Sequence, residues 1–95
     1  MRENAVENPV VFRAERAGFF VRKVSWIGRA GAPDRLFARK DRGQVYIEFK
    51  RPGGTPDAHQ VREHRKMREA GIEVHICDSV EDALIVLGLS NGGPR

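Results

Sequence analysis

Hydrophobic and polar residues alternate most clearly along residues 44–50, which read Gln-Val-Tyr-Ile-Glu-Phe-Lys. Side chains of a strand point alternately to its two faces. One face of this predicted strand is therefore apolar and carries Val45, Ile47 and Phe49, and the other carries Tyr46, Glu48 and Lys50. Residues 35–40 predict a second strand, and the intervening KDRGQ, in which Gly43 can adopt a positive φ, predicts an antiparallel hairpin.

Three helices are expected from the capping and breaking residues. The first runs from about Asn4 to Ala17, and Pro9 indicates either that the helix begins just before it or that it bends there. A second helix over 56–70 follows Thr55 as its N-cap. A third, over 80–87, is closed by a glycine and begins with a serine that has an acidic residue three positions later.

The order of elements predicts an α/β fold. Residues 20–25 and 73–77 read as two further strands, so the order is α-β-β-β-α-β-α. The helix over 56–70 can serve as a crossover between parallel strands, which predicts a mixed central sheet flanked by helices. We expect one domain over 1–89 and a C-terminal tail over 90–95.

Composition narrows the class of protein. The chain has 95 residues, of which 40% are hydrophobic and 32% charged, which suits one small globular domain. A single cysteine, Cys77, excludes an internal disulfide, and no stretch resembles a signal peptide or a membrane span. We therefore expect a cytoplasmic protein, and its net charge of +4 favours a polyanionic partner.

Two carboxylates are predicted to meet at the end of the hairpin. If the hairpin closes around Asp41 and Arg42, any register within one residue places Asp34 opposite residues 48–50. Opposed residues have Cβ atoms about 5 Å apart, and two carboxylates at that separation repel unless a cation lies between them. A divalent ion such as Mg²⁺ needs only one or two protein carboxylates together with water. Asp34 and Glu48 are therefore the candidate metal ligands.

The lysine two residues after Glu48 completes this candidate site. Lys50 shares a face of the strand with Glu48, so it could orient a water molecule or accept its proton if its pKa is lowered. A metal ion would offset charge on a phosphate under attack, which predicts a phosphodiesterase. The alternatives are a solvated Glu48–Lys50 salt bridge and a turn role for Asp34.

These motifs resemble those of a known family. GAPD followed by EFK resembles the PD-(D/E)xK nuclease superfamily. GRAGAPDRLF, VYIEFKRPGG and HQVREHRKMREAGIEVHICDS together resemble the VRR-NUC family, the virus-type replication–repair nucleases, over about residues 3–87. The resemblance implies a restriction-endonuclease-like core and a Mg²⁺-dependent endodeoxyribonuclease, with Mn²⁺ as a substitute metal.

The resemblance also implies a role for each matching residue. Asp34 and Glu48 correspond to the metal-binding carboxylates, and the backbone carbonyl of Phe49 corresponds to a further metal ligand. Lys50 corresponds to the catalytic lysine. Gln60 matches a glutamine at the start of the helix that follows the active-site strand, and its predicted helix face, which includes Val61 and Met67, points inward.

The opening helix is expected to supply one more acid. AVEN and AGFFVRK resemble the opening of archaeal junction resolvases, which favours Glu7 over Glu3 as a catalytic and metal-binding residue. The alternative is that Glu7 only complements the dipole of the helix.

Five basic residues are candidate contacts for DNA phosphates. Two flank Asp34 and three lie on the outer arc of the second helix: Arg29, Arg35, Arg62, Arg65 and Lys66. Arginine matches phosphate with paired donors. An ordinary solvated helix face is the alternative for the last three.

The most specific prediction is a Holliday-junction resolvase of viral or prophage type, acting on branched DNA in a bacterial cell or phage-infected host. Two opposed cuts in a junction favour a homodimer, whose interface we expect around Leu84–Leu89. The alternatives are a monomeric flap or nicking nuclease of DNA repair and a catalytically silent DNA-binding module.

Overall fold

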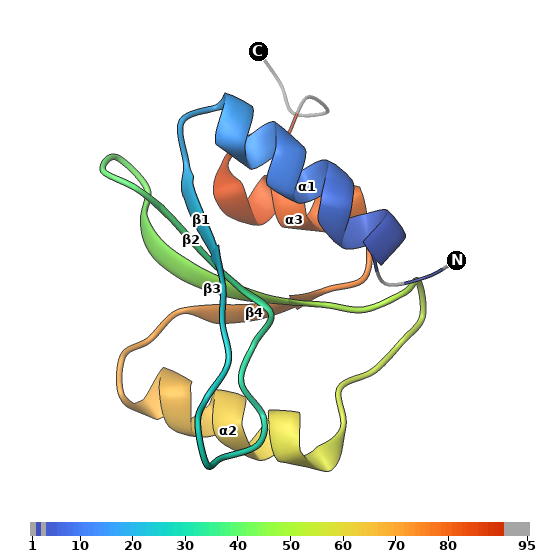
Figure 1. Cartoon of the computed structure of the whole chain (residues 1–95), viewed down its shortest axis with the longest axis vertical. Helices are drawn as coiled ribbons and strands as arrows, with labels where there is room; N and C mark the ends of the chain where they lie inside the picture. Colours follow the sequence, from blue (N-terminus) through green and yellow to red (C-terminus); the bar gives the residue numbers. More distant parts are fainter. Residues whose placement is uncertain (1, 3, 91–95) are drawn as a thin grey trace.

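The computed structural model describes residue 2 and residues 4–90 of the chain. Its elements follow the predicted order (Figure 1). They are α1 (Asn4–Arg16), β1 (Phe20–Lys23), β2 (Arg35–Arg39), β3 (Gly43–Phe49), α2 (Ala58–Glu69), β4 (Val74–Cys77) and α3 (Val80–Leu87). The predicted α/β class and element order are therefore confirmed.

The four strands form one mixed sheet in the order β1-β2-β3-β4. β2 pairs antiparallel with both β1 and β3, and β4 lies parallel to β3. The hairpin turn has Arg39 opposite Gly43, whose φ of 84° is the left-handed conformation that glycine adopts at little cost. The α2 crossover between β3 and β4 is the connection that a parallel pair requires.

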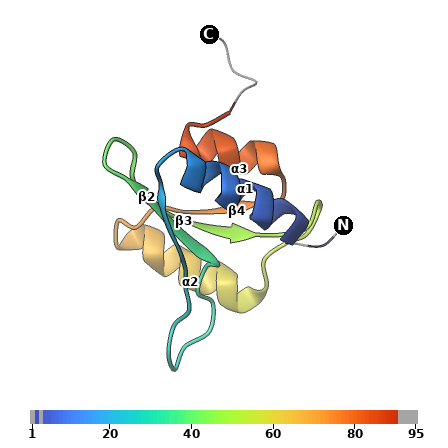
Figure 2. The same cartoon turned by 45° about the horizontal axis from the view of Figure 1, so that its top comes forward.

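The helices cover the two faces of the sheet unequally. α1 and α3 lie side by side over one face, and α2 lies alone on the other (Figures 1 and 2). The apolar side of β3 packs under α1 and α3. The core between this face of the sheet and the two helices consists of Val6, Val10, Ala14, Phe19, Val21, Phe37, Val45, Ile47, Phe49, Cys77, Ala83 and Leu87.

The first helix does not start late. α1 runs without interruption through Pro9, so a start just before this residue is wrong. A proline inside a helix costs one hydrogen bond and introduces a steric clash. The apolar stripe of Val6, Val10 and Ala14, all fully buried, stabilises this face of the helix on both sides of the proline.

The second helix begins later than predicted. Its N-cap is Asp57, not Thr55, and the helix covers Ala58–Glu69. Asp57 forms a reciprocal capping box with Gln60, which satisfies two backbone donors that Thr55 could not reach from its position. Of the residues assigned to the inward face, Met67 is buried, but Val61 is 44% exposed.

The last helix agrees with its prediction. Ser79 accepts from the backbone of Asp82, and Gly88 closes the helix in the left-handed conformation. The predicted tail lies outside the described residues apart from Ser90, whose hydroxyl donates to Glu81. Within residues 2 and 4–90, no helix is both long and apolar enough to cross a membrane.

Candidate active site

Asp34 and Glu48 face each other across the end of the hairpin. The paired register ends with Arg35 opposite Ile47, so the next opposed positions are Asp34 and Glu48. Opposed residues of an antiparallel pair point to the same face, which here is the face toward α2. Asp34 Oδ2 also accepts a hydrogen bond of 2.8 Å from the backbone of Phe49. The structure thus brings the two predicted carboxylates together.

The carboxylate of Glu48 is buried and held by two side chains. Lys50 Nζ lies 3.3 Å from Glu48 Oε2, and Gln60 Nε2 donates to the same oxygen at 2.6 Å. Glu48 is only 3% exposed. Its other oxygen, Oε1, is buried and has no hydrogen-bond partner among the described residues. A buried oxygen of this kind is costly unless something pairs with it.

The surroundings of Glu48 disfavour its negative charge. The pKa of Glu48 is raised to about 7, mainly by burial and further by the charge of Asp34, while Lys50 and Gln60 oppose the rise. Two close carboxylates and partial desolvation are conditions that a cation would relieve. The electrostatics of the pair therefore fit a metal site.

The backbone of Phe49 points toward the same place. Lys50 donates its backbone N–H to Cys77 on β4, so the backbone groups of the even-numbered residues of β3 face β4. Those of the odd-numbered residues face β2, and in a strand the N–H and C=O of one residue point the same way. Because the N–H of Phe49 meets Asp34, its carbonyl also lies on the side of Asp34.

The capping box orients Gln60. Its side-chain oxygen accepts from the backbone of Asp57 at 3.1 Å, while Asp57 accepts from the backbone of Gln60 at 2.9 Å. This leaves the amide nitrogen of Gln60 to donate to Glu48. Gln60 lies at the site as predicted, but the N-cap that orients it was missed because Thr55 offered a competing start signal.

Glu7 contacts Arg35, the residue that follows Asp34. Arg35 Nε donates to Glu7 Oε2 at 2.6 Å, and the side chain of Arg35 shares the α1 face of the sheet with that of Ile47. Among the described residues, no third His, Cys, Asp or Glu joins Asp34 and Glu48. Glu3, the other candidate acid of the opening segment, lies outside the described residues. The structure thus pairs two predicted site residues, Glu7 and Arg35, with each other.

The other predicted DNA contacts are exposed basic residues. Arg29 lies on the loop between β1 and β2, and the rest lie on α2: Arg62, Arg65 and Lys66. Arg62 contacts His59 Nδ1 at 3.1 Å. The loop and α2 lie on the same side of the sheet (Figure 1).

The loop over 24–34 holds Asp34 in place, which the sequence did not reveal. Its neck is closed by a hydrogen bond of 3.0 Å from the backbone of Val24 to the carbonyl of Asp34. Trp26 packs edge-on against Tyr46 of β3. Gly31 lies so close to α2 that a Cβ atom there would be 2.6 Å from the carbonyl oxygen of His59. The GxP spacing before Asp34 is the sequence signal of this close approach.

The fold and the sequence are similar to those of known proteins. No family model matches the chain. A solved structure described as "VRR_NUC domain" superposes with a TM-score of 0.80 at 35% sequence identity, covering 90% of this chain and 94% of that one. The "Putative nuclease p44" of Acyrthosiphon pisum secondary endosymbiont phage 1 is 34% identical over 79 residues, which are 83% of this chain and 85% of that protein.

The fold and the relatives define a nuclease of the α/β class. The chain belongs to the VRR-NUC family. The family assignment made from the GxPD, ExK and downstream glutamine motifs is therefore confirmed.

Proposed function

We propose that the protein is a Mg²⁺-dependent endonuclease that hydrolyses phosphodiester bonds of branched DNA, with four-way junctions as its substrate. One observation carries the chemistry. A buried carboxylate, Glu48, lies opposite Asp34; one of its oxygens has no partner in the described part of the chain, and the other contacts both Lys50 and Gln60. A salt bridge that only stabilised the fold would not need this arrangement, because burying an unpaired carboxylate oxygen opposite a second acid costs stability.

The residues present fit a divalent cation with oxygen ligands. Glu48 Oε1, a carboxylate oxygen of Asp34 and the carbonyl of Phe49 would hold Mg²⁺, or Mn²⁺ in its place. When bound, such an ion offsets the charge that develops on the phosphate during attack. The ion pair of Glu7 with Arg35 makes Glu7 a ligand only if that pair opens, so we assign it no position at the metal.

Lys50 and Gln60 have different roles in the proposed reaction. Lys50 is only 13% exposed and lies beside Glu48, where its amine can orient the attacking water and, in the neutral form, accept the proton of that water. Gln60 fixes the carboxylate of Glu48 through the rigid capping box of α2. Family resemblance implies products with 5′-phosphate and 3′-hydroxyl ends.

The choice of DNA as substrate is supported by charge. The chain carries 17 Lys and Arg residues against 13 Asp and Glu residues. Exposed arginines lie on the loop that ends at Asp34 and on α2, the two segments that flank the carboxylates. Binding should therefore weaken steeply as salt rises, since each neutralised phosphate releases counterions.

The proposal includes a homodimer, because a junction needs two opposed cuts and one chain carries one Asp34–Glu48 pair. The expected interface over Leu84–Leu89 needs correction. Leu84 and Leu87 are buried in the chain's own core, because α3 packs on α1, and only Ile85, at 58% exposure, offers a large apolar side chain there. We therefore place the partner surface at the edge strand β1, where Phe20, at 49% exposure, is the largest exposed apolar side chain.

The test is cleavage of a matched set of labelled DNAs (four-way junction, 5′-flap, nicked duplex and linear duplex) with Mg²⁺ and with a chelator. We expect Mg²⁺-dependent paired cuts in the junction. A supercoiled cruciform plasmid should yield linear product in one encounter, and light scattering should give a dimer mass. A monomer that cuts flaps would replace the junction proposal with the repair-nuclease alternative. Binding without cleavage under every metal condition would overturn the enzyme proposal.

A further inference from the structure

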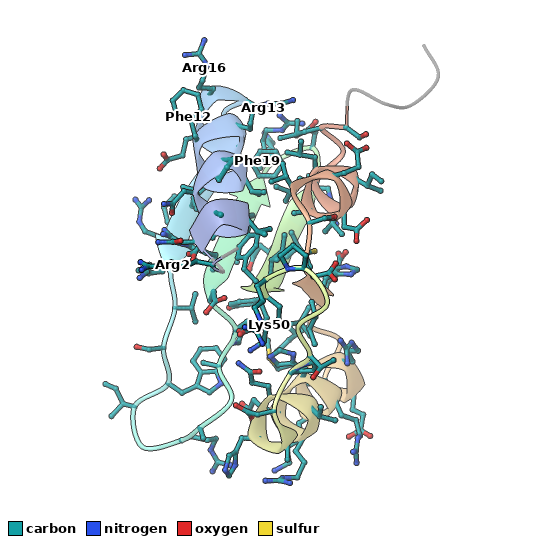
Figure 3. The ribbon with its side chains drawn as sticks, turned by 90° about the vertical axis from the view of Figure 1, so that its right-hand side faces the viewer. Arg2, Phe12, Arg13, Arg16, Phe19 and Lys50 are labelled. Carbon is teal, nitrogen blue, oxygen red and sulfur yellow. The ribbon has the colours of Figure 1, made fainter. Side chains whose placement is uncertain are left out.

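A cavity adjoins the active site on the side of the α1 start. Its volume is about 680 Å³, and it lies where the first residues of α1 meet the turn that follows β3. Its lining consists of Arg2, Asn4, Lys50, Arg51, Gly53, Gly54 and Thr55. Lys50 thus belongs both to the carboxylate pair and to this cavity. Figure 3 shows Lys50 below the first turns of α1, while Arg16 lies at the far end of that helix.

The charged residues of the described lining are all positive. Three of its described residues are cations (Arg2, Lys50 and Arg51), and none is acidic. The remaining side chains are an amide and a hydroxyl, which can donate hydrogen bonds. Arginine pairs with phosphate through two parallel hydrogen bonds. The cavity therefore has the chemistry of a phosphate site. Its volume is larger than the space that the Lys50 amine alone would occupy.

The turn over residues 51–54 forms one wall of the cavity, and its backbone is held in place by hydrogen bonds. The backbone of Gly54 donates to Arg51 at 2.8 Å, with Pro52 second and Gly53 third at a φ of 79°, which is the pattern of a type II turn. Gly53 donates to Asp78 Oδ2 at 2.9 Å, which ties the turn to the end of β4. A Cβ atom on Gly54 would lie 3.2 Å from Lys50 Cβ, so glycine lets the turn lie against the lysine.

We propose that this cavity binds the backbone phosphate next to the scissile one on the strand being cut, with Arg51 and Arg2 as its ligands. The inference builds on the proposed DNA cleavage and adds a subsite to it. Because Lys50 lines the cavity and also contacts Glu48, a strand whose scissile phosphate lies at Glu48 has its neighbouring phosphate at Arg51. Arg51 and Arg2 are positioning residues that set which phosphodiester is cut.

The first test is single-turnover cleavage by Arg51→Ala and Arg2→Ala, with Arg16→Ala as the matched control. Arg16 is an exposed arginine twelve residues after the start of α1, about 18 Å along the helix. We expect kcat/KM to fall about tenfold for Arg51→Ala, as for the loss of a charge-assisted hydrogen bond. The fall should be smaller for Arg2→Ala, and Arg16→Ala should leave the rate unchanged. Circular dichroism confirms that each variant is folded.

The second test locates the phosphate. In a series of substrates, a single neutral methylphosphonate replaces one phosphate at a time around the cut. The cleavage rate of each substrate is measured with the wild type and with Arg51→Ala. We expect one position next to the cut at which the methylphosphonate slows cleavage by the wild type about tenfold. At that position it should not slow Arg51→Ala further, because the variant has already lost the same contact. Arg16→Ala should respond to that substitution as the wild type does.

The outcomes separate this inference from the proposed function. If the wild type cuts DNA and the effects of Arg51→Ala and of every methylphosphonate are additive, the cavity is not a phosphate site although the nuclease stands. An equal loss in Arg16→Ala would show a general charge effect and would also overturn the inference. Absence of wild-type cleavage would instead overturn the proposed function on which the subsite depends.

Discussion

The two faces of the sheet differ in how they treat buried polar groups. The face under α1 and α3 is a continuous apolar cluster that includes Phe37, Ile47 and Phe49. On the face toward α2, Glu48 and His64 are the buried polar residues, 3% and 1% exposed. Every buried side-chain nitrogen or oxygen without a partner in the described part of the chain belongs to Trp26, Glu48 or His64.

This difference indicates that the apolar face stabilises the fold, whereas the face toward α2 buries polar groups at a cost in stability. Burying apolar surface is favourable at about 25 cal/mol per Å², whereas an unsatisfied buried polar group costs about 1–3 kcal/mol. A small domain can keep such groups only if the opposite face is well packed. Substitutions on the two faces should therefore have opposite effects on stability and activity.

The largest effect is expected from Lys50→Ala on the α2 face. If this amine holds the attacking water as proposed, its loss should reduce the cleavage rate by about 10²–10⁴-fold. DNA binding, shared among many basic residues, should stay nearly unchanged. Single-turnover cleavage and fluorescence anisotropy measure the two quantities. Lys40→Ala, an exposed lysine in the hairpin turn, is the control. Near-normal turnover in Lys50→Ala would remove this lysine from the mechanism.

On the opposite face, Phe37→Ala should lower the free energy of unfolding by about 3–5 kcal/mol, because it leaves a cavity in the packed core. Denaturant unfolding measures the change. Val61→Ala on the exposed side of α2 is the control and should change stability by less than about 0.5 kcal/mol. If both substitutions cost the same, the two layers do not differ as described.

The pH dependence of stability should report the charge of Glu48. Its pKa is raised from 4.5 to about 7, so the folded protein binds a proton more tightly than the unfolded chain. The resulting stabilisation is fully present below about pH 4.5 and is lost as the pH rises through about 7, by up to about 3 kcal/mol in the metal-free protein. Glu48→Gln should abolish this loss together with cleavage.

Urea titrations at pH 5 and pH 8 without metal measure this dependence. Glu15→Gln, at an exposed position of α1, should keep the wild-type dependence. Parallel curves for the wild type and Glu48→Gln would mean that Glu48 has an ordinary pKa in the fold.

The smallest effect is expected from His64, which titrates in the opposite sense. Burial, then the charge of Arg68 and to a lesser extent that of Lys50, lower its pKa, while the Gly31 backbone and Glu63 oppose the shift. A lowered pKa gives stability that is present above about pH 6.5 and lost as the pH falls through the folded value.

On acidification from pH 7, protonation of Glu48 stabilises the fold and protonation of His64 opposes this gain. His64→Leu should therefore make the gain in stability on acidification steeper. The same pH titration in urea detects the change, with His59→Leu on the exposed side of α2 as control. An unchanged slope in His64→Leu would show that this histidine does not contribute to the difference between the faces.

Much of the site could be predicted because β-structure has a strict period. Alternation along β3 put Glu48 and Lys50 on one face, and a hairpin with a glycine in its turn put Asp34 opposite Glu48. Only a shift of the register could have changed that, and a one-residue shift would have exposed Ile47. The placement of Gln60 followed from the family resemblance and from the helix face that it shares with Met67, although Val61 of that predicted face is exposed and the predicted helix began too early.

The errors lie where two local signals compete or where distant segments meet. Thr55 and Asp57 are both good N-caps, and the hydrogen bond of Gln60 to Glu48, 12 residues away, accompanies the choice of Asp57. Glu7 pairs with Arg35, 28 residues away in the chain, and its expected place at the metal stays a prediction. No periodicity in the sequence encodes such a pair.

The sequence by itself determined the element order, the apolar face of β3 and the opposition of two acids beside a lysine, because these depend on residues close along the chain and on fixed backbone periods. Only the tertiary structure decided what covers the other face. There α2 and the loop over 24–34 bury Glu48, and the turn after Lys50 meets the start of α1 to form the cavity. Burial and cavities arise from packing between distant segments, which is a property of the whole fold.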